Sequence, residues 1–111
     1  MKELIILRHA KSNRSYGVED IHRPLSVEGI ERIKKVSNKK HDFFEKADVI
    51  ISSPANRALH TAMIMMQELN LPQEKLTIDK NLYTFSVISV IDYIYGLWYI
   101  AYTAILIGKI R

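Results

Sequence analysis

The stretch LIILRHAKS, residues 4–12, decides the fold. Its first four residues are apolar without alternation, which predicts a strand over 3–7 that is covered on both faces, as in a parallel sheet. Arg8 and His9 follow at once, with no turn residue between them and the strand. The chain therefore leaves the core with two side chains that can bind an anion.

Further strands and helices alternate along the chain. Ser26 is a candidate N-cap for a helix whose core face carries Ile30, Ile33 and Val36, and Ser53 can cap a later helix with Pro54 in its first position. The core stripe of that later helix comprises Ala58, Ala62, Met65, Met66 and Leu69. The predicted strands are 3–7, 48–53, 75–79 and 102–108, and the predicted helices are 25–44, 54–69 and 86–97. This alternation predicts an α/β domain around a largely parallel sheet.

Composition limits the class of protein. The 111 residues allow one domain, and 48% hydrophobic with 25% charged residues is ordinary for a globular chain. The absence of cysteine excludes disulfides and thiolate metal sites and suits a reducing compartment, so we expect a cytoplasmic protein. A formal charge of +4 favours anionic ligands only weakly, and without a basic–aromatic motif we expect no nucleic-acid partner.

The predicted parallel sheet brings polar residues to one edge. Ligands of such sheets bind beyond the carboxyl ends of the strands, where Arg8 and His9 follow the first strand and Ser53 and Arg57 follow the second. A helix N-terminus beside them adds partial positive charge. Two arginines, a histidine and a helix N-terminus suit a dianion such as a phosphoryl group. The plainer alternative, in which each is an unrelated surface side chain, stays open from these residues alone.

Three motifs resemble those of the histidine phosphatase superfamily, which includes the cofactor-dependent phosphoglycerate mutases. They are LIILRHAKS at 4–12, RPLSVEGIERI at 23–33 and VIISSPANRALHTA at 49–62, and Ala10 stands where glycine is commoner. The likeness is greatest to SixA-like phosphohistidine phosphatases, covers about residues 1–97 and returns at 103–108. It implies a single domain over 1–111 with three α/β/α layers and a mostly parallel central sheet, as in phosphoglycerate mutase.

The resemblance also implies a mechanism. His9 would be the nucleophile, because a neutral imidazole attacks phosphorus and gives a phosphohistidine that water hydrolyses. Arg8 and Arg57 would hold the phosphoryl oxygens, with Ser53 also in the phosphate-binding group. The expected substrate is a phosphohistidine protein or a small phosphorylated molecule. We expect no metal and no cofactor, and we interpret His22, His41 and His60 as surface or packing residues.

Two departures from the family pattern affect these expectations. A second histidine normally follows the strand at 103–108 in a Gly-His pair, whereas this sequence has Gly108-Lys109. The expectation is therefore a C-terminally truncated domain, whose last strand is left as an apolar edge. An alternative is an impaired pseudoenzyme that binds a phosphorylated ligand. Many members also carry an acidic proton donor after the third strand, and Asp79, the nearest carboxylate, is not expected to serve.

The region 85–108 allows one further alternative. It holds only one charged residue, Asp92, and is about long enough to cross a bilayer. Because the family resemblance explains the same apolarity as a buried helix and a buried strand, we expect no membrane association.

Overall fold

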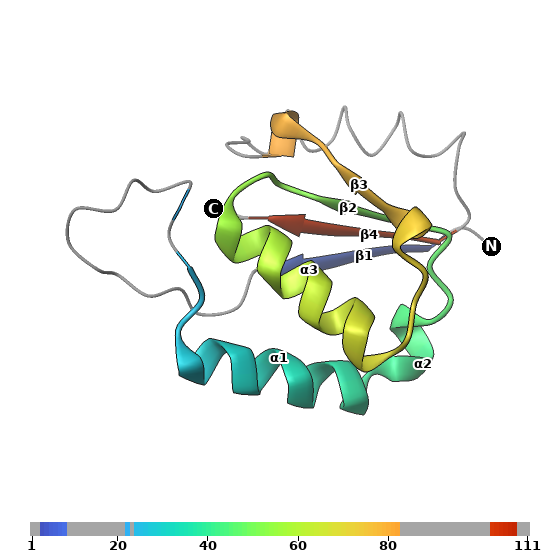
Figure 1. The fold of residues 1–111 in the computed structure, drawn as a ribbon. Coiled ribbons are helices and arrows are strands. Elements are labelled where there is room, and N and C mark those ends of the chain that lie inside the picture. The colour runs from blue at the N-terminus through green and yellow to red at the C-terminus, as the bar shows by residue number, and fades with distance from the viewer. Residues whose placement is uncertain (1–2, 9–21, 23, 83–102, 109–111) are drawn as a thin grey trace.

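The computed structural model describes residues 3–8, 22, 24–82 and 103–108. Its strands are β1 (Glu3–Arg8), β2 (Val49–Ser52), β3 (Leu76–Ile78) and β4 (Thr103–Gly108). Its helices are α1 (Val27–Lys39), α2 (His41–Phe44) and α3 (Asn56–Glu68). Short 3-10 turns at Gln73–Lys75 and Lys80–Leu82 flank β3 (Figure 1). The four predicted strands are confirmed, each with slightly different bounds.

The strands form one parallel sheet in the order β1-β4-β2-β3. β4 therefore lies between β1 and β2, and Ile105 is in register with both Ile5 and Ile50. The expectation that the last strand is an exposed apolar edge is wrong. Ile105 and Ile107 are fully buried because β4 has a strand on each side.

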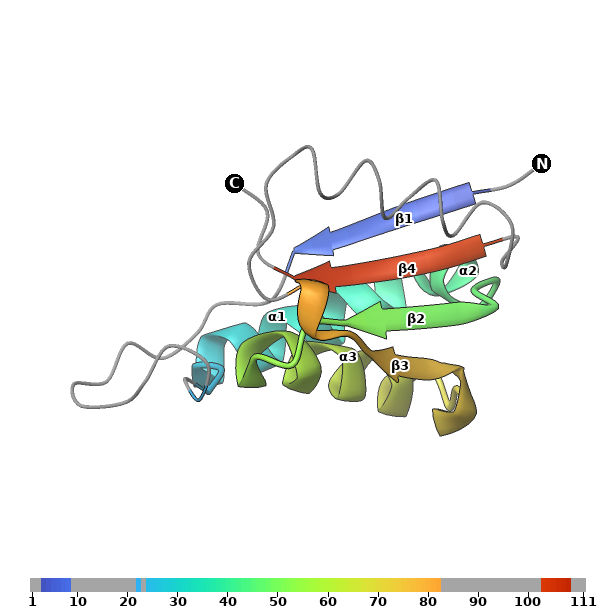
Figure 2. The same cartoon turned by 90° about the horizontal axis from the view of Figure 1, so that it is seen from above.

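The helices α1 and α3 cover one face of this sheet (Figure 2). Ile50, Ile105 and Ile107 contribute to the core on that face, together with apolar residues of both helices. The core stripe predicted for the helix at 54–69, which is α3, is confirmed. Ala58, Ala62, Met65 and Met66 are buried, and Leu69 packs against the core. A mostly parallel sheet with helices on this face agrees with the predicted α/β class.

The first long helix begins where the sequence predicts. The Ser26 hydroxyl accepts a hydrogen bond from the Gly29 N–H at 3.0 Å, which is the bond of an N-cap. Ile33 is buried, and Ile30 and Val36 pack against the core from the same helix face. The predicted single helix over 25–44 divides after Lys39 into α1 and α2.

The third helix begins later than predicted. Its N-cap is Ala55, so neither a cap by Ser53 nor Pro54 in the first helical position is borne out. The helix ends at Glu68, and Asn70, two residues further on, has a φ of 53°. The N–H groups of Asn70 and Leu71 bond back to the carbonyls of Gln67 and Met66, a Schellman motif that places a residue tolerant of left-handed conformation after the helix.

Two expectations concern the last third of the chain. The helix predicted at 86–97 lies outside the described residues. Among the residues that are described, no helix combines the length and apolarity that a membrane crossing requires. Residues 103–108, which the membrane alternative included, form the inner strand β4 instead.

Candidate active site

The carboxyl ends of three strands meet at one edge of the sheet. Arg8, the last residue of β1, is in register with Gly108 at the end of β4, and Ser52 of β2 is in register with Ile107. Figure 1 shows the tips of β1 and β4 on the side where α3 begins. Neighbouring strands lie about 4.8 Å apart, so about 10 Å separates the backbones of β1 and β2. Gly108 lies between them and carries no side chain into that interval.

The turn that connects β2 to α3 is buried and held by hydrogen bonds. The Ser53 N–H donates to the carbonyl of Ile107 at 2.9 Å, which extends the β2–β4 ladder by one residue. The Ser53 hydroxyl accepts from the Ala55 N–H at 3.2 Å, and the Ser52 hydroxyl donates to the Ser53 carbonyl at 2.8 Å. The chain thus turns sharply from the strand into the helix beside the end of β4.

Arg57 lies in the first turn of α3, next to this buried turn, and is only 3% exposed. A guanidinium group loses solvation when it is buried, so a sequence retains it there only with polar partners. Among the described residues no buried side-chain nitrogen or oxygen lacks a hydrogen-bond partner. Arg57 is therefore a fixed cation at the carboxyl edge rather than a solvated surface residue.

Thr61 and Asn56 hold the start of α3 in place. The fully buried Thr61 hydroxyl donates to the Arg57 carbonyl at 2.6 Å. The Asn56 side-chain amide donates to the carbonyl of His22 at 2.9 Å, which fastens the segment before α1 to the start of α3. Sequence reasoning missed both bonds. The spacing of four residues between Arg57 and Thr61 could have indicated the first, whereas the second joins residues 34 apart.

The N-terminus of α3 points toward the same edge. Its N-cap, Ala55, has no side-chain oxygen, and the first turn contains no acidic residue. The N-cap residue therefore offers no side-chain acceptor to the first N–H groups of the helix. The first turn also holds no carboxylate that would compete with an anion for these N–H groups. A helix N-terminus of this kind favours negative charge beside it.

The predicted site residues can now be placed. Arg57 and Ser53 lie together at the β2–α3 turn, and the backbone of Arg8 ends β1 two strands away at the same edge. The side chain of Arg8 and the whole of His9 lie outside the described residues. Ser53 is 1% exposed and its hydroxyl already accepts a bond within the turn, so its role in phosphate binding stays a prediction.

Asp79 comes closer to this edge than the sequence indicated. It follows β3 directly, and its N–H donates to the carbonyl of Ser52 at 2.9 Å. Its side chain is half-buried. The sheet order places β3 beside β2, so the carboxylate that follows β3 lies next to the end of β2. The sequence did not reveal this strand order.

The other histidines were predicted to be surface or packing residues. His22 and His41 are exposed, and His60 is half-exposed on α3. The described residues do bring three possible metal ligands within 4.8 Å of one another, namely His41, Asp42 and Glu45. All three are exposed on or just after α2, and the His41 ring nitrogen lies 3.2 Å from Asp42 and 3.7 Å from Glu45, so the geometry indicates a surface cluster and no more.

Comparison with known proteins accounts for this arrangement. The family model of the histidine phosphatase superfamily, branch 1, matches residues 4–83, which include the end of β1, the segment before α1 and the β2–α3 turn. The chain belongs to the histidine phosphatase superfamily. All three motifs of the sequence lie within the matched residues.

Individual members of the histidine phosphatase superfamily resemble the chain in sequence and in structure. A 2,3-bisphosphoglycerate-dependent phosphoglycerate mutase from Nautilia profundicola is 37% identical over 76 residues, which are 64% of this chain and 32% of the mutase. A proposed SixA phosphohistidine phosphatase from Agrobacterium tumefaciens superimposes with a TM-score of 0.82 at 21% identity, over 96% of this chain and 68% of that one. The chain thus spans about a third of the curated relative it matches.

A second solved structure agrees with the first. The protein histidine phosphatase SixA in complex with tungstate has a TM-score of 0.82 at 20% identity, over 97% of this chain and 69% of that protein. Both superpositions confirm the expected phosphoglycerate mutase-like fold.

Proposed function

We propose that the chain is a phosphohydrolase that transfers a phosphoryl group from its substrate to His9 and then to water. One ring nitrogen of His9 attacks phosphorus while the bond to the leaving group breaks, and water later cleaves the phosphorus–nitrogen bond. Arg8 and Arg57 hold the equatorial oxygens, on which charge is spread in the transition state. No metal or cofactor takes part in these steps.

The observation that carries this proposal is the burial of Arg57. It is 3% exposed in the first turn of α3, at the edge where β1 ends with Arg8. A buried, fixed guanidinium costs little reorganisation when charge develops on a bound phosphoryl group. Membership of the superfamily supports the same role, and tungstate, a phosphate analogue, is bound in one of the SixA structures of the same fold.

The substrate we propose is a phosphohistidine-bearing protein, with small phosphate esters as weaker substrates. The likeness of the fold to SixA proteins supports a protein substrate, and the phosphoglycerate mutase relative supports a small phosphate ester. Hydrolysis of a phosphohistidine protein faster than of para-nitrophenyl phosphate would favour the first. The reverse order would favour the second.

Trapping of the intermediate tests the proposed mechanism. Incubation with radiolabelled acetyl phosphate should label the protein with a phosphoryl group that is lost in acid and stable in base, as a phosphoramidate is. His9→Ala should abolish the label, whereas His60→Ala, which removes a half-exposed histidine of α3, should retain it. Label that survives in His9→Ala, or that resists acid, would assign the nucleophile elsewhere.

A second candidate function is binding of a phosphorylated ligand without turnover. The observation that favours it is Lys109, which follows Gly108 where the family pattern has histidine. Lysine brings a charge on a flexible stem, not a fixed ring. Lys109→His should then raise turnover of para-nitrophenyl phosphate by about 10²–10³ while phosphate affinity changes little. Equal turnover in both proteins would remove the support for this candidate.

A further inference from the structure

Asn56 is the first residue of α3 and directly precedes Arg57. Its side chain is exposed, whereas Ala55 and Arg57 on either side of it are buried. Water could satisfy an exposed amide, yet the Asn56 amide donates to the backbone carbonyl of His22 at 2.9 Å, across 34 residues of sequence. The bond therefore joins the start of α3 to a distant segment of the chain.

The segment that Asn56 holds leads directly into α1. Leu25 is 6% exposed in the core, and the Ser26 hydroxyl caps α1 through the Gly29 N–H. In both views α1 and α3 begin on the side of the molecule where β1 and β4 end (Figures 1 and 2). The bond from Asn56 to His22 therefore lies at the carboxyl edge of the sheet.

The chain that connects β1 to α1 has both of its ends at this edge. Arg8 ends β1 there, and His9, the proposed nucleophile, follows at once. At the other end, the His22 carbonyl is fastened to the residue beside Arg57. The Asn56 amide therefore sets where the segment that begins with the nucleophile returns, relative to the buried guanidinium.

An asparagine meets two needs at this position. Aspartate or glutamate in the first turn would stabilise the helix N-terminus, but the first turn of α3 holds neither. A carboxylate at position 56 would lie beside the proposed phosphoryl site and could not donate to the His22 carbonyl. The amide supplies the donor and adds no negative charge.

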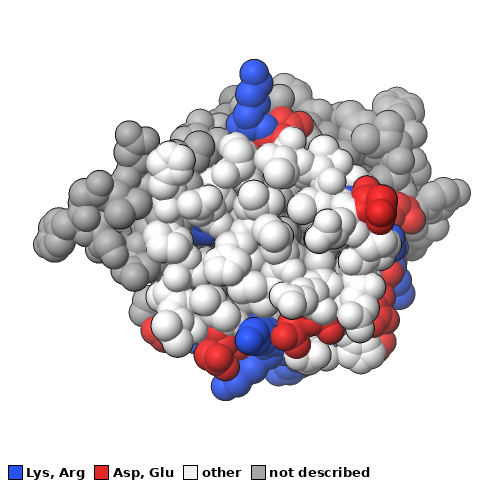
Figure 3. Space-filling model, in the orientation of Figure 1, with Lys and Arg blue, Asp and Glu red and all other residues white. Residues whose placement is uncertain are grey.

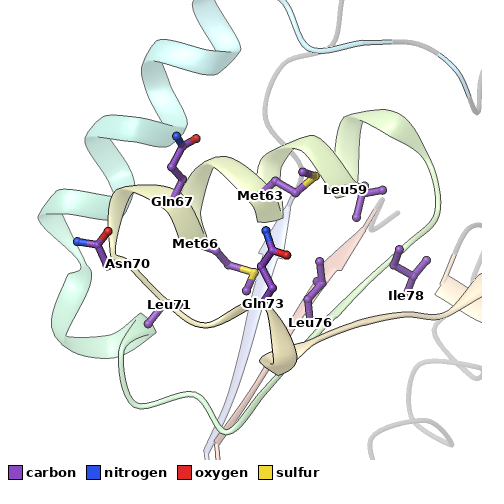
Figure 4. Close-up of a pocket in the computed structure, with 9 residues that line it drawn as sticks. All are labelled: Leu59, Met63, Met66, Gln67, Asn70, Leu71, Gln73, Leu76 and Ile78. Carbon is purple, nitrogen blue, oxygen red and sulfur yellow. The ribbon is translucent and has the colours of Figure 1, made fainter.

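The groove that α3 borders with β3 is uncharged. It has a volume of about 850 Å³, and none of the residues that line it carries a charge (Figure 4). Figure 3 shows that charged side chains are sparse over α3 and gather along the margin formed by α1. Arg57 and the helix N-terminus therefore make the start of α3 the part of this helix that attracts a phosphoryl group.

We propose that Asn56 is a positioning residue of the phosphoryl transfer, whose amide holds the His22 carbonyl and so fixes the segment that begins with His9 relative to Arg57. The inference rests on the proposed function, in which His9 attacks phosphorus while Arg57 holds the phosphoryl oxygens. Asn56 itself touches no reacting atom. Loss of its bond lowers the rate because groups that act together in the transition state tolerate little displacement.

Asn56→Ala tests this role. We expect kcat for para-nitrophenyl phosphate to fall by about tenfold or more with KM nearly unchanged, because Arg57 remains to bind the substrate. Asn38→Ala is the matched control, since the Asn38 amide donates to the Glu68 carboxylate at 3.0 Å and joins α1 to the last residue of α3. It should lower the melting temperature to a similar extent but leave kcat unchanged.

Asn56→Asp separates positioning from folding. Its carboxylate stabilises the helix N-terminus, so this variant should melt at no lower temperature than Asn56→Ala. Because it cannot donate to the His22 carbonyl and repels the phosphoryl group, it should lower kcat as far as Asn56→Ala does and also raise KM by about fivefold. Gln67→Glu makes the same amide-to-carboxylate change in the last turn of α3 and should alter neither constant.

The outcomes distinguish this inference from the proposed function. If His9→Ala is inactive while Asn56→Ala keeps the kcat of the unaltered protein, the proposed function stands and the role of Asn56 is refuted. A loss of kcat in Asn38→Ala as large as that in Asn56→Ala refutes it as well. An unaltered protein without turnover, or full turnover in His9→Ala, removes the proposed function and the role of Asn56 with it.

Discussion

Arg57 shows how a single residue links the fold to the proposed chemistry. It is buried in the first turn of α3, so its side chain is held before any ligand arrives. Arg57→Lys retains the charge but loses the planar fork that can bind two oxygens at once. We expect kcat/KM for para-nitrophenyl phosphate to fall by about 10²–10³. Arg32→Ala, an exposed arginine of α1, should leave kcat/KM unchanged. Equal losses in both variants would contradict the role of Arg57.

Thr61 positions the turn of helix that carries Arg57. Its hydroxyl donates to the Arg57 carbonyl at 2.6 Å, and Ser37 makes the same kind of bond to Ile33 at 2.7 Å within α1. Thr61→Val and Ser37→Ala should each lower the free energy of unfolding by about 1 kcal/mol, since each removes one buried hydrogen bond. Only Thr61→Val should also weaken phosphate binding, measured by calorimetry. If the two variants bind phosphate equally well, Thr61 has a structural role alone.

At the scale of elements, β4 holds the sheet together because it pairs with both β1 and β2. Ile105 is fully buried in it, whereas Ile6 of β1 is 47% exposed. Ile105→Ala should cost about 2–5 kcal/mol of unfolding free energy in urea denaturation, because it leaves a cavity in the core. Ile6→Ala should cost clearly less. Similar costs would mean that β4 is not the inner strand.

The elements also show what local sequence can and cannot predict. Continuous apolar runs located β1, β2 and β4, and the spacing of Ile30, Ile33 and Val36 located α1, because both signals depend on near neighbours. Strand order depends on contacts between distant residues, so the sequence placed β4 at an edge when it is central. The start of α3 was misplaced because the Ser53 hydroxyl bonds to Ala55 in the turn instead of capping the helix.

The same distinction applies to the candidate site. The carboxyl ends of parallel strands lie at one edge of a sheet, which predicted that Arg8 and Arg57 lie at the same edge. The backbones of both residues do lie at that edge. The bond between Asn56 and His22 and the approach of Asp79 to Ser52 were not predicted. Each joins segments that are distant in sequence, and no local pattern indicates such a contact.

For the molecule as a whole, the central claim is that the carboxyl edge of the sheet binds a phosphoryl group. A crystal structure of the protein soaked with tungstate tests it most directly, because the anion is heavy enough to be located unambiguously. The account predicts one anion beyond the ends of β1 and β2, within hydrogen-bond distance of the guanidinium groups of Arg8 and Arg57 and of the His9 ring. An anion bound elsewhere, or a His9 ring directed away from Arg57, would contradict the account.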